Sequence, residues 1–339
     1  MDKWYEKSGD QGDVVISTRI RLARNLKEFP FPCKLQDEER EKVATAVRAA
    51  ILGEQSAISS SFEYIDMKRL TETQAVSLVE RHLVSPEFIS ERQGRGLLLM
   101  KDESVSIMIN EEDHVRIQVM KQGLDLEGAY EMADRLDTLL DEELSFAFDD
   151  RLGYLTQCLT NLGTGMRASL MLHLPALQES GAMGRIAGSL SKLGMTIRGI
   201  YGEGSEPRGA LYQLSNQVTL GLSEQAAMSN LKDIAMQLIS QERAARQAAG
   251  KHRETLALVG RSLGILRGAR VLNNDEFMKL VSNVRLGISL GVIDNISYDT
   301  INALLIEAQP ATLMENAGKT MQPQERDVLR AKLVQEALH

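Results

Sequence analysis

Apolar and polar residues alternate along several short stretches of the chain, with the period of two that is typical of a strand with one buried face. In the first stretch, residues 14–22, one face carries Val14, Ile16, Thr18, Ile20 and Leu22, and the other carries Val15, Ser17, Arg19 and Arg21. Residues 105–120 read VSIMINEEDHVRIQVM, which predicts two strands joined by a short acidic turn. The same alternation predicts strands at 195–201, at 211–220 and at 167–174, where Ala168, Leu170, Leu172 and Leu174 oppose Arg167, Ser169, Met171 and His173.

Helical periodicity, with apolar residues three and four apart, fills the segments between these strands. It covers residues 37–52, 71–84, 124–144, 178–193 and 223–249, and Ser223 followed by Glu224 is a typical helix start. Short connections beside strands of alternating polarity favour an antiparallel sheet with one face covered by helices. The predicted fold class is therefore α+β.

The strand pattern ends near Gly250. Residues 251–339 read mostly as amphipathic helices, such as those at 275–289 and 297–308. We therefore predict a boundary near residues 245–252, which separates a sheet-containing domain at 14–244 from a small all-α domain at 251–339. A chain of 339 residues is long enough for one large and one smaller domain.

Composition excludes several classes of function. The formal net charge of −8, the aromatic content of 4% and the lack of a basic helix argue against a nucleic-acid partner. No apolar run is long enough to span a bilayer, and the first dozen residues, MDKWYEKSGDQG, lack the apolar core of an export signal. With only Cys33 and Cys158, we expect a reduced, cytoplasmic protein without a structural disulfide.

Arginines recur on the predicted polar strand faces, at Arg19, Arg21, Arg116 and Arg167, with Arg198 as a fifth candidate. Residues two apart on a strand point the same way, roughly 6.5 to 7 Å apart, so one strand presents two guanidinium forks to adjacent phosphates. Taken singly, each arginine is more often a solvated sheet residue paired with a carboxylate. Several of them on strands of one sheet favour a shared anionic ligand.

Carboxylates complete the candidate chemistry. The predicted acidic turn is Asn110-Glu111-Glu112-Asp113-His114, and Glu203 lies in the glycine-rich stretch 201–206. Both segments, like Gly163-Thr164-Gly165, are also typical of ordinary exposed turns. Arginines for phosphates together with carboxylates for a cation fit phosphoryl transfer to a guanidinium, in which the protein positions reactants and neutralises charge. A carboxylate pair aligns the guanidinium nitrogens and accepts a proton.

Four strings carry a family resemblance: STRIRLARN at 17–25, NEEDHVRIQ at 110–118, CLTNLGTGMRASLMLHLP at 158–175 and RGIYGEGSE at 198–206. They resemble the phosphagen kinases, the ATP:guanido phosphotransferases that include creatine and arginine kinases, and most closely the protein-arginine kinases among them. The resemblance covers residues 14 to about 244. It implies a glutamine-synthetase-like catalytic domain, ATP and Mg²⁺ as cofactors, and transfer of the γ-phosphoryl group to arginine side chains of proteins.

Carried over motif by motif, the resemblance also implies individual roles. The implied ATP contacts are Ser17, Thr18, Arg19, Ile20, Arg21, His82, Arg116, Arg167, Ala168, Ser169, Leu170, Met171, Arg198, Gly199, Ile200, Tyr201, Gly202 and Glu203. Glu112 is the implied catalytic base and Glu203 its partner, with Cys158 near the guanidinium; no protein ligand set for a metal is implied. Leu159 follows Cys158 where the family usually has proline. His82, as an isolated helix histidine, is otherwise a surface residue.

The C-terminal residues resemble the extra domain of the protein-arginine kinases. Arg326, Asp327, Arg330 and Ala331 match its RDxxRA motif, which the resemblance implies is an allosteric phosphoarginine pocket. Arg326 and Arg330 are one helical turn apart and are expected to grip phosphate, while Asp327 takes the guanidinium. Without the resemblance this is an ordinary charged helix face.

Partners and substrate access are likewise implied by resemblance. Sixteen residues precede Ser17, where small-molecule phosphagen kinases have a helical domain, so we expect a site open to protein-borne arginine. The implied partners are a zinc-finger activator, a Clp ATPase and protease, a heat-shock repressor as substrate, and a second copy in a homodimer. Two alternatives stay open: a kinase for free arginine or another small guanidine, and an inactive adaptor that reads phosphoarginine.

Overall fold

The computed structural model describes residues 2–54, 56–199 and 207–339, and the structural statements below concern these residues. Their main feature is an eight-stranded sheet with the order β2-β3-β4-β5-β1-β8-β10-β9, in which each neighbouring pair is antiparallel. The strands are β1 (Val15–Arg24), β2 (Phe62–Asp66), β3 (Gly96–Met100), β4 (Val105–Ile109), β5 (Val115–Gln122), β8 (Met166–His173), β9 (Met195–Gly199) and β10 (Leu211–Asn216). The predicted antiparallel sheet is confirmed. A separate hairpin joins β6 (Phe148–Asp149) and β7 (Gly153–Tyr154).

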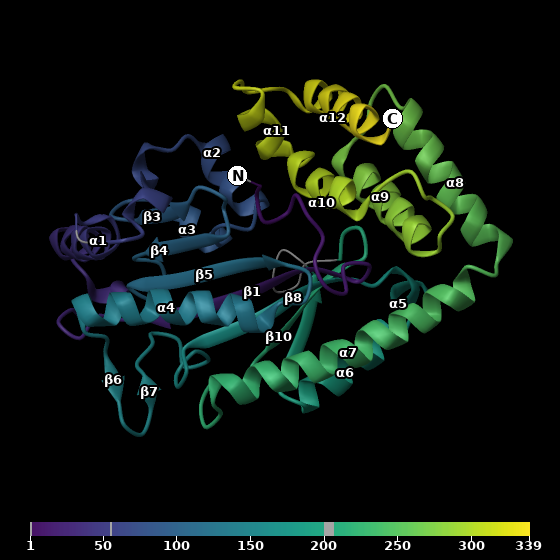
Figure 1. Cartoon of the computed structure of the whole chain (residues 1–339). Helices are drawn as coiled ribbons and strands as arrows, with labels where there is room; N and C mark the ends of the chain where they lie inside the picture. The colour runs from purple at the N-terminus through teal and green to yellow at the C-terminus, as the bar shows by residue number, and fades with distance from the viewer. Residues whose placement is uncertain (1, 55, 200–206) are drawn as a thin grey trace.

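Helices cover one whole face of the sheet. They are α1 (Asp37–Leu52), α4 (Leu126–Leu144), α5 (Pro175–Glu179), α6 (Met183–Lys192) and α7 (Glu224–Ala249). Their apolar side chains pack in one cluster with the strand residues of the predicted apolar faces, including Ile20, Ile117 and Leu170. Figure 1 shows α4 and α7 running along this face.

The second face is covered only at its two ends. Over β3, β4 and β5 lie Trp4, Tyr5, α2 (Glu72–Glu80) and α3 (Pro86–Ser90). Over the other end lie the C-terminal helices α8 (Arg253–Gly268), α9 (Asn274–Ser289), α10 (Tyr298–Glu307) and α12 (Pro323–Leu338), which form one apolar cluster with Ile16 and Leu211. The short helix α11 (Pro310–Asn316) packs instead against α2. Figure 1 shows these helices gathered beyond the sheet. The polar strand face between the two covers is left open.

Local corrections to the predicted elements have identifiable causes. A register shift between Val15 and Ser17 interrupts β1, so that Val14 and Val15 both enter the helix-covered core while Ile16 packs against the C-terminal helices. Such a bulge adds one residue and reverses the facing of those before it. The helix predicted at 178–193 is broken into α5 and α6 at Gly181, whose φ is +71°. The strand predicted at 211–220 ends at Asn216.

Three short 3₁₀ helices complete the elements: η1 (Pro32–Lys34), η2 (Ser59–Ser61) and η3 (Met67–Arg69). Helix α7 ends at Ala249 and α8 begins at Arg253, within the region where the domain boundary was predicted. The boundary itself stays a prediction. In the described part of the chain, no helix combines the length and apolar character that crossing a membrane requires.

Candidate active site

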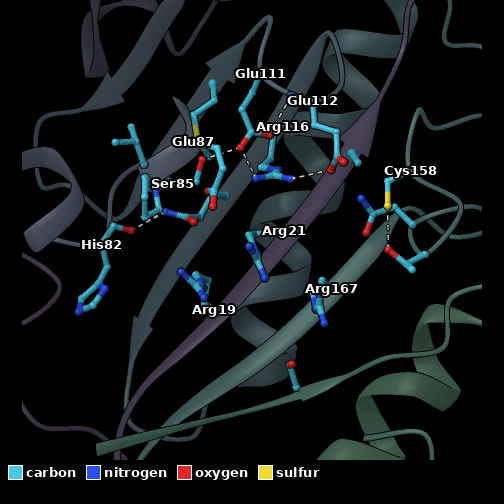
Figure 2. A pocket seen from close by; sticks show the side chains of 18 of the residues that line it. Arg19, Arg21, His82, Ser85, Glu87, Glu111, Glu112, Arg116, Cys158 and Arg167 are labelled. Atoms are coloured by element: carbon cyan, nitrogen blue, oxygen red, sulfur yellow. Dashed lines mark hydrogen bonds and ion pairs between the residues drawn. The ribbon is translucent and has the colours of Figure 1, made fainter. Parts of the chain in front are cut away.

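A cavity of about 640 Å³ opens on the uncovered part of the polar strand face. Arginines from four strands of the sheet line it: Arg19 and Arg21 on β1, Arg116 on β5 and Arg167 on β8, which are neighbours, and Arg198 on β9 beyond β10. The register brings them together, because Arg21 lies opposite Arg167 and Ala23 lies opposite Arg116. Figure 2 shows the first four between His82 on one side and Cys158 on the other.

The positive charges at the floor of this cavity repel one another. Burial, with the charges of Arg116 and Arg167, lowers the pKa of Arg19 to about 10. Burial, with the charges of the neighbouring arginines, also lowers the pKa of Arg21 well below its ordinary value. Arg19 donates to neutral groups, Gln213 Oε1 at 2.6 Å and Ser169 Oγ at 3.3 Å. Within the described residues, the buried Nε of Arg21 has no hydrogen-bond partner. Because a buried charge requires a counter-charge, the cluster fits an anion with several charges.

The acidic turn places two carboxylates at one wall of the cavity. Arg116 donates from Nη1 to Glu111 Oε1 at 2.6 Å, and from Nη2 to Glu112 Oε2 at 3.5 Å. The Glu112 side chain is 38% exposed. Burial raises the pKa of Glu112, as do the charges of Asp113 and Glu111, while Arg116 and a hydrogen bond from the Cys158 thiol lower it. A half-exposed carboxylate with a raised pKa suits a proton acceptor.

Other residues of the same turn are buried and hold its shape. Asp113 Oδ1 accepts from Asn25 Nδ2 at 2.6 Å and from the Gln157 N–H at 2.8 Å. His114 Nδ1 accepts the Leu26 N–H at 3.0 Å, and burial lowers the pKa of His114 to about 4. The turn is therefore a rigid support for Glu111 and Glu112 rather than a solvated tip.

His82 and Cys158 lie at opposite sides of the cavity (Figure 2). His82 comes just after α2 with a φ of 60°, in the left-handed region, which ends the helix earlier than predicted. Burial and the charge of Arg19 lower the pKa of His82 to about 3, so the imidazole is neutral at physiological pH. The Cys158 sulfur lies 3.0 Å from Thr160 Oγ1 and borders the same wall as Glu112.

Several lining residues were missed from the sequence: Ser85, Glu87, Arg95, Glu111, Gln118, Gln213 and Ser215. The strand alternation contained a signal for some of them, because Gln118 is two residues from Arg116, and Gln213 and Ser215 share the polar face of β10. Glu111 lies beside Glu112 in the acidic turn, a segment that is also typical of ordinary exposed turns. Ser85 and Glu87 carry no pattern of their own; the turn after α2 brings them to the cavity.

Some residues carried over from the motifs do not line this cavity with their side chains. Thr18, Ile20, Ala168 and Leu170 are buried toward the opposite, helix-covered face, where Thr18 Oγ1 donates to the Gly123 carbonyl at 2.6 Å. Ser17 and Met171 pair beyond the cavity, nearer the C-terminal helices. A contact from Thr18, Ile20, Ala168 and Leu170 is limited to their main chain, because alternate strand residues point to opposite faces. Ser17 and Met171 lie on the same strand face as Arg19 and Arg167 but outside the lining of the cavity. Gly199 lines the cavity, and Ile200, Tyr201, Gly202 and Glu203 lie outside the described residues.

The RDxxRA motif lies on α12, and its geometry differs from the expected phosphate clamp. Arg330 is 1% exposed and donates to the carbonyls of Ala308 and Leu272, each at 2.8 Å, and to Asp327 at 2.6 Å. Ala331 is buried in the helical core. Arg326 is half-buried on the same helix. Arg330 therefore ties α12 to the carbonyls of neighbouring helices and loops, and the binding of phosphoarginine by this motif stays a prediction. In the described residues, no group of three or more histidine, cysteine or acidic side chains is arranged to hold a metal ion.

Family models match two successive parts of the chain. Residues 42–245 match the ATP:guanido phosphotransferase C-terminal catalytic domain. Residues 253–339 match the protein-arginine kinase McsB C-terminal domain.

Relatives match over the full length. A protein-arginine kinase from Caldanaerobacter subterraneus subsp. tengcongensis is 47% identical over 96% of this chain and 97% of its own length. One from Clostridium acetobutylicum is 44% identical over the whole of both chains.

Solved structures resemble the sheet-containing part. The crystal structure of lombricine kinase has a TM-score of 0.62 and 27% identity, and covers 71% of this chain and 69% of its own. The duplicated taurocyamine kinase from Schistosoma mansoni with bound transition-state-analogue components has a TM-score of 0.62 and 29% identity, over 74% of this chain and 37% of its own.

Proposed function

This chain belongs to the ATP:guanido phosphotransferase family, and from that premise we propose that it is an ATP-dependent kinase of arginine side chains in proteins. The observation that carries the proposal is the shared cavity, where Arg19, Arg21 and Arg116 face the Glu112 carboxylate. Arginines are the groups that bind the phosphates of ATP, and a carboxylate is the group that binds a guanidinium. The names of the full-length relatives favour protein arginine over a small guanidine as the acceptor.

The guanidinium forks on β1, β5 and β8 hold the triphosphate and neutralise charge as it develops, since a fixed arginine donates parallel, charge-assisted bonds. The buried, unpartnered Nε of Arg21 fits a nucleotide phosphate oxygen. Mg²⁺ carried by the phosphates of the nucleotide would offset their charge.

Glu112 accepts the proton that the acceptor nitrogen releases. One guanidinium nitrogen forms a bond to the γ-phosphorus, the bond from that phosphorus to the β,γ-bridging oxygen breaks, and ADP leaves with the electron pair. Glu203, outside the described residues, is proposed as the second carboxylate that orients the guanidinium, as the family resemblance implies. Cys158 borders the same wall and is proposed to lie beside the bound guanidinium.

Glu112→Gln tests the assignment of the base. The variant keeps the shape of the side chain and its contact with Arg116, so nucleotide affinity should be retained, while arginine phosphorylation should fall by at least about 100-fold. Transfer is measured on casein with MgATP by mass spectrometry under non-acidic conditions, because the N–P bond is acid-labile. Glu63→Gln, remote from this cavity on β2, is the control. Normal transfer by Glu112→Gln would disprove the role.

The wider biology rests on family resemblance. We propose that phosphorylation marks proteins for a Clp ATPase and protease, regulates a heat-shock repressor in the cytoplasm, and responds to a zinc-finger activator. A homodimer and phosphoarginine binding near the RDxxRA motif belong to the same proposal. Because Arg330 is buried, such binding at α12 requires either Arg326 with other donors or a local rearrangement.

A further inference from the structure

Bulky apolar side chains are exposed on the Cys158 side of the cavity mouth. Leu159 is 80% exposed and stands between Cys158 and Thr160, both of which line the cavity. Neighbouring segments expose further side chains of the same kind: Phe148, Leu152, Leu193, Val218 and Leu220. We define these six residues as the rim patch.

Hydrogen bonds join the loops that carry the rim patch. Thr219 Oγ1 donates to the carbonyls of Thr160 at 3.0 Å and Leu162 at 2.7 Å, so Val218 and Leu220 flank the loop of Leu159. The Gln217 N–H donates to the Gly194 carbonyl at 2.9 Å, which brings Leu193 alongside.

The β6–β7 hairpin adjoins the same loop. The Tyr154 N–H donates to the Gly163 carbonyl at 2.8 Å, and the Tyr154 ring packs edge-on against Phe148 at 5.2 Å. A Cβ on Gly163, whose φ is +108°, would lie 2.8 Å from the Leu220 Cα, so only glycine allows this approach. The loops that carry these exposed side chains are therefore joined to one another beside Cys158.

The position of the rim patch beside the cavity indicates which part of a substrate would contact it. The cavity floor takes phosphates and a guanidinium, so the residues on either side of a target arginine must lie on the rim. In an extended segment, residues two positions from the arginine lie roughly 7 Å away on the same side, within reach of Leu159 and its neighbours. A second copy of this chain held permanently on these loops would obstruct the mouth of the cavity.

We propose that the rim patch binds apolar side chains that flank the target arginine, so that the enzyme favours arginines with a bulky apolar residue about two positions away. This inference rests on the proposed function, because it names the substrate segment of the same site. Exposed apolar side chains gathered on neighbouring loops commonly mark a protein-binding site. Backbone of the segment lies across the rim while its arginine enters the cavity.

Two peptides of equal length test the proposal, each with a single arginine flanked two positions away on both sides by leucine in one and by serine in the other. We expect the wild-type chain to phosphorylate the leucine peptide with a kcat/KM roughly tenfold higher. The double variant Leu159→Ser, Leu220→Ser should lose that preference and keep its rate on the serine peptide and its KM for ATP. Leu256→Ser, an exposed leucine on α8, is the matched control and should retain the preference.

The outcomes separate this inference from the proposed function. Equal rates of the wild-type chain on both peptides overturn the inference alone, and so does a preference that survives in the double variant. Phosphorylation of neither peptide and of no protein overturns the proposed function, and the inference with it. A lower oligomer mass of the double variant by sedimentation would assign the rim patch to contacts between copies and would also overturn it.

Discussion

At the residue scale, the side chains of the cavity differ in how they are held: some have partners of opposite charge, and others have only neutral partners. Glu111 is buried and accepts from Arg116 at 2.6 Å and from Ser85 Oγ at 2.5 Å, and its second oxygen accepts the Glu112 N–H at 3.1 Å. It therefore positions a phosphate-facing guanidinium and the backbone of the proposed base at once. The buried Nε of Arg21 has no hydrogen-bond partner in the described residues, so this guanidinium is the one best placed to donate to a bound anion.

His82 provides a prediction at this scale. The pKa of His82 is about 3 in the folded chain, below the ordinary 6.5. As the pH falls between these two values, His82 therefore binds a proton in the unfolded chain but not in the folded chain. The wild type should lose unfolding free energy relative to His82→Asn by about 1.4 kcal/mol per pH unit below pH 6.5. Asparagine tolerates the left-handed backbone at this position.

Urea unfolding of both chains at pH 6.5, 5.5 and 4.5 measures this difference, because the contributions of other titrating groups cancel between them. If the unfolding free energies of the two chains changed with pH in parallel, His82 would take up its proton in the folded chain as well, which would contradict the prediction. The same neutrality predicts that His82 adds no pH dependence to nucleotide binding between pH 6 and 8.

At the element scale, one carboxylate joins the two helical covers of the second sheet face. Glu80, at the end of α2, accepts the N–H of Ala311 at 3.0 Å, the N–H of Thr312 at 2.7 Å and Thr312 Oγ1 at 3.0 Å, and so caps α11. Arg81 pairs with Glu315 farther along α11 at 3.3 Å. The residues just before His82 are thus fixed by the C-terminal helices.

Glu80→Ala should lower the unfolding free energy by about 1 to 2 kcal/mol, since it removes a partly buried cap and leaves the first amides of α11 unpaired. Hydrogen exchange at Ala311 and Thr312 should accelerate roughly tenfold. Glu72→Ala, at the exposed start of α2, serves as the control and should change stability by less than about 0.5 kcal/mol. Unchanged exchange in Glu80→Ala would mean that α11 does not depend on this cap.

At the scale of the whole molecule, buried arginines hold the C-terminal helices to the sheet and to the N-terminal segment. Arg246 pairs with Glu242 at 2.7 Å and donates to the Asp13 carbonyl and to Ser289 Oγ, each at 2.9 Å. Arg285 on α9 donates to the Gly12 carbonyl at 2.5 Å. These contacts therefore fix the position of the C-terminal helices that border one side of the open polar strand face.

Arg246→Met should cost about 3 to 5 kcal/mol of stability, because it leaves the fully buried Glu242 without its partner. Arg243→Met is a matched control on the same helix; its side chain is 41% exposed and pairs with Asp13, so its loss should cost at most about 1 kcal/mol. Denaturant unfolding measures both. The double variant Arg246→Met, Glu242→Met should recover part of the loss, and equal losses in the two single variants would contradict the argument.

The antiparallel sheet, most of its strands and the identity of the polar strand faces followed from the sequence alone, because a period of two or 3.6 assigns each side chain to a face before any packing is known. Strands β2 and β3 were not predicted. That period placed Arg19, Arg21, Arg116 and Arg167 on faces where they later meet. The four strings similarly identified the family. These properties are local or carried by short motifs.

Tertiary structure decided what periodicity cannot express. The bulge at Ile16 and the left-handed His82 break the patterns, since each reflects contacts with elements far away in the chain. Glu111, Ser85 and Gln213 joined the site through strand register and a turn, and Arg330 became a buried structural residue because α12 packs its guanidinium onto the carbonyls of Leu272 and Ala308. A sequence fixes the direction of a side chain within its own element, and only packing between elements fixes what that side chain meets.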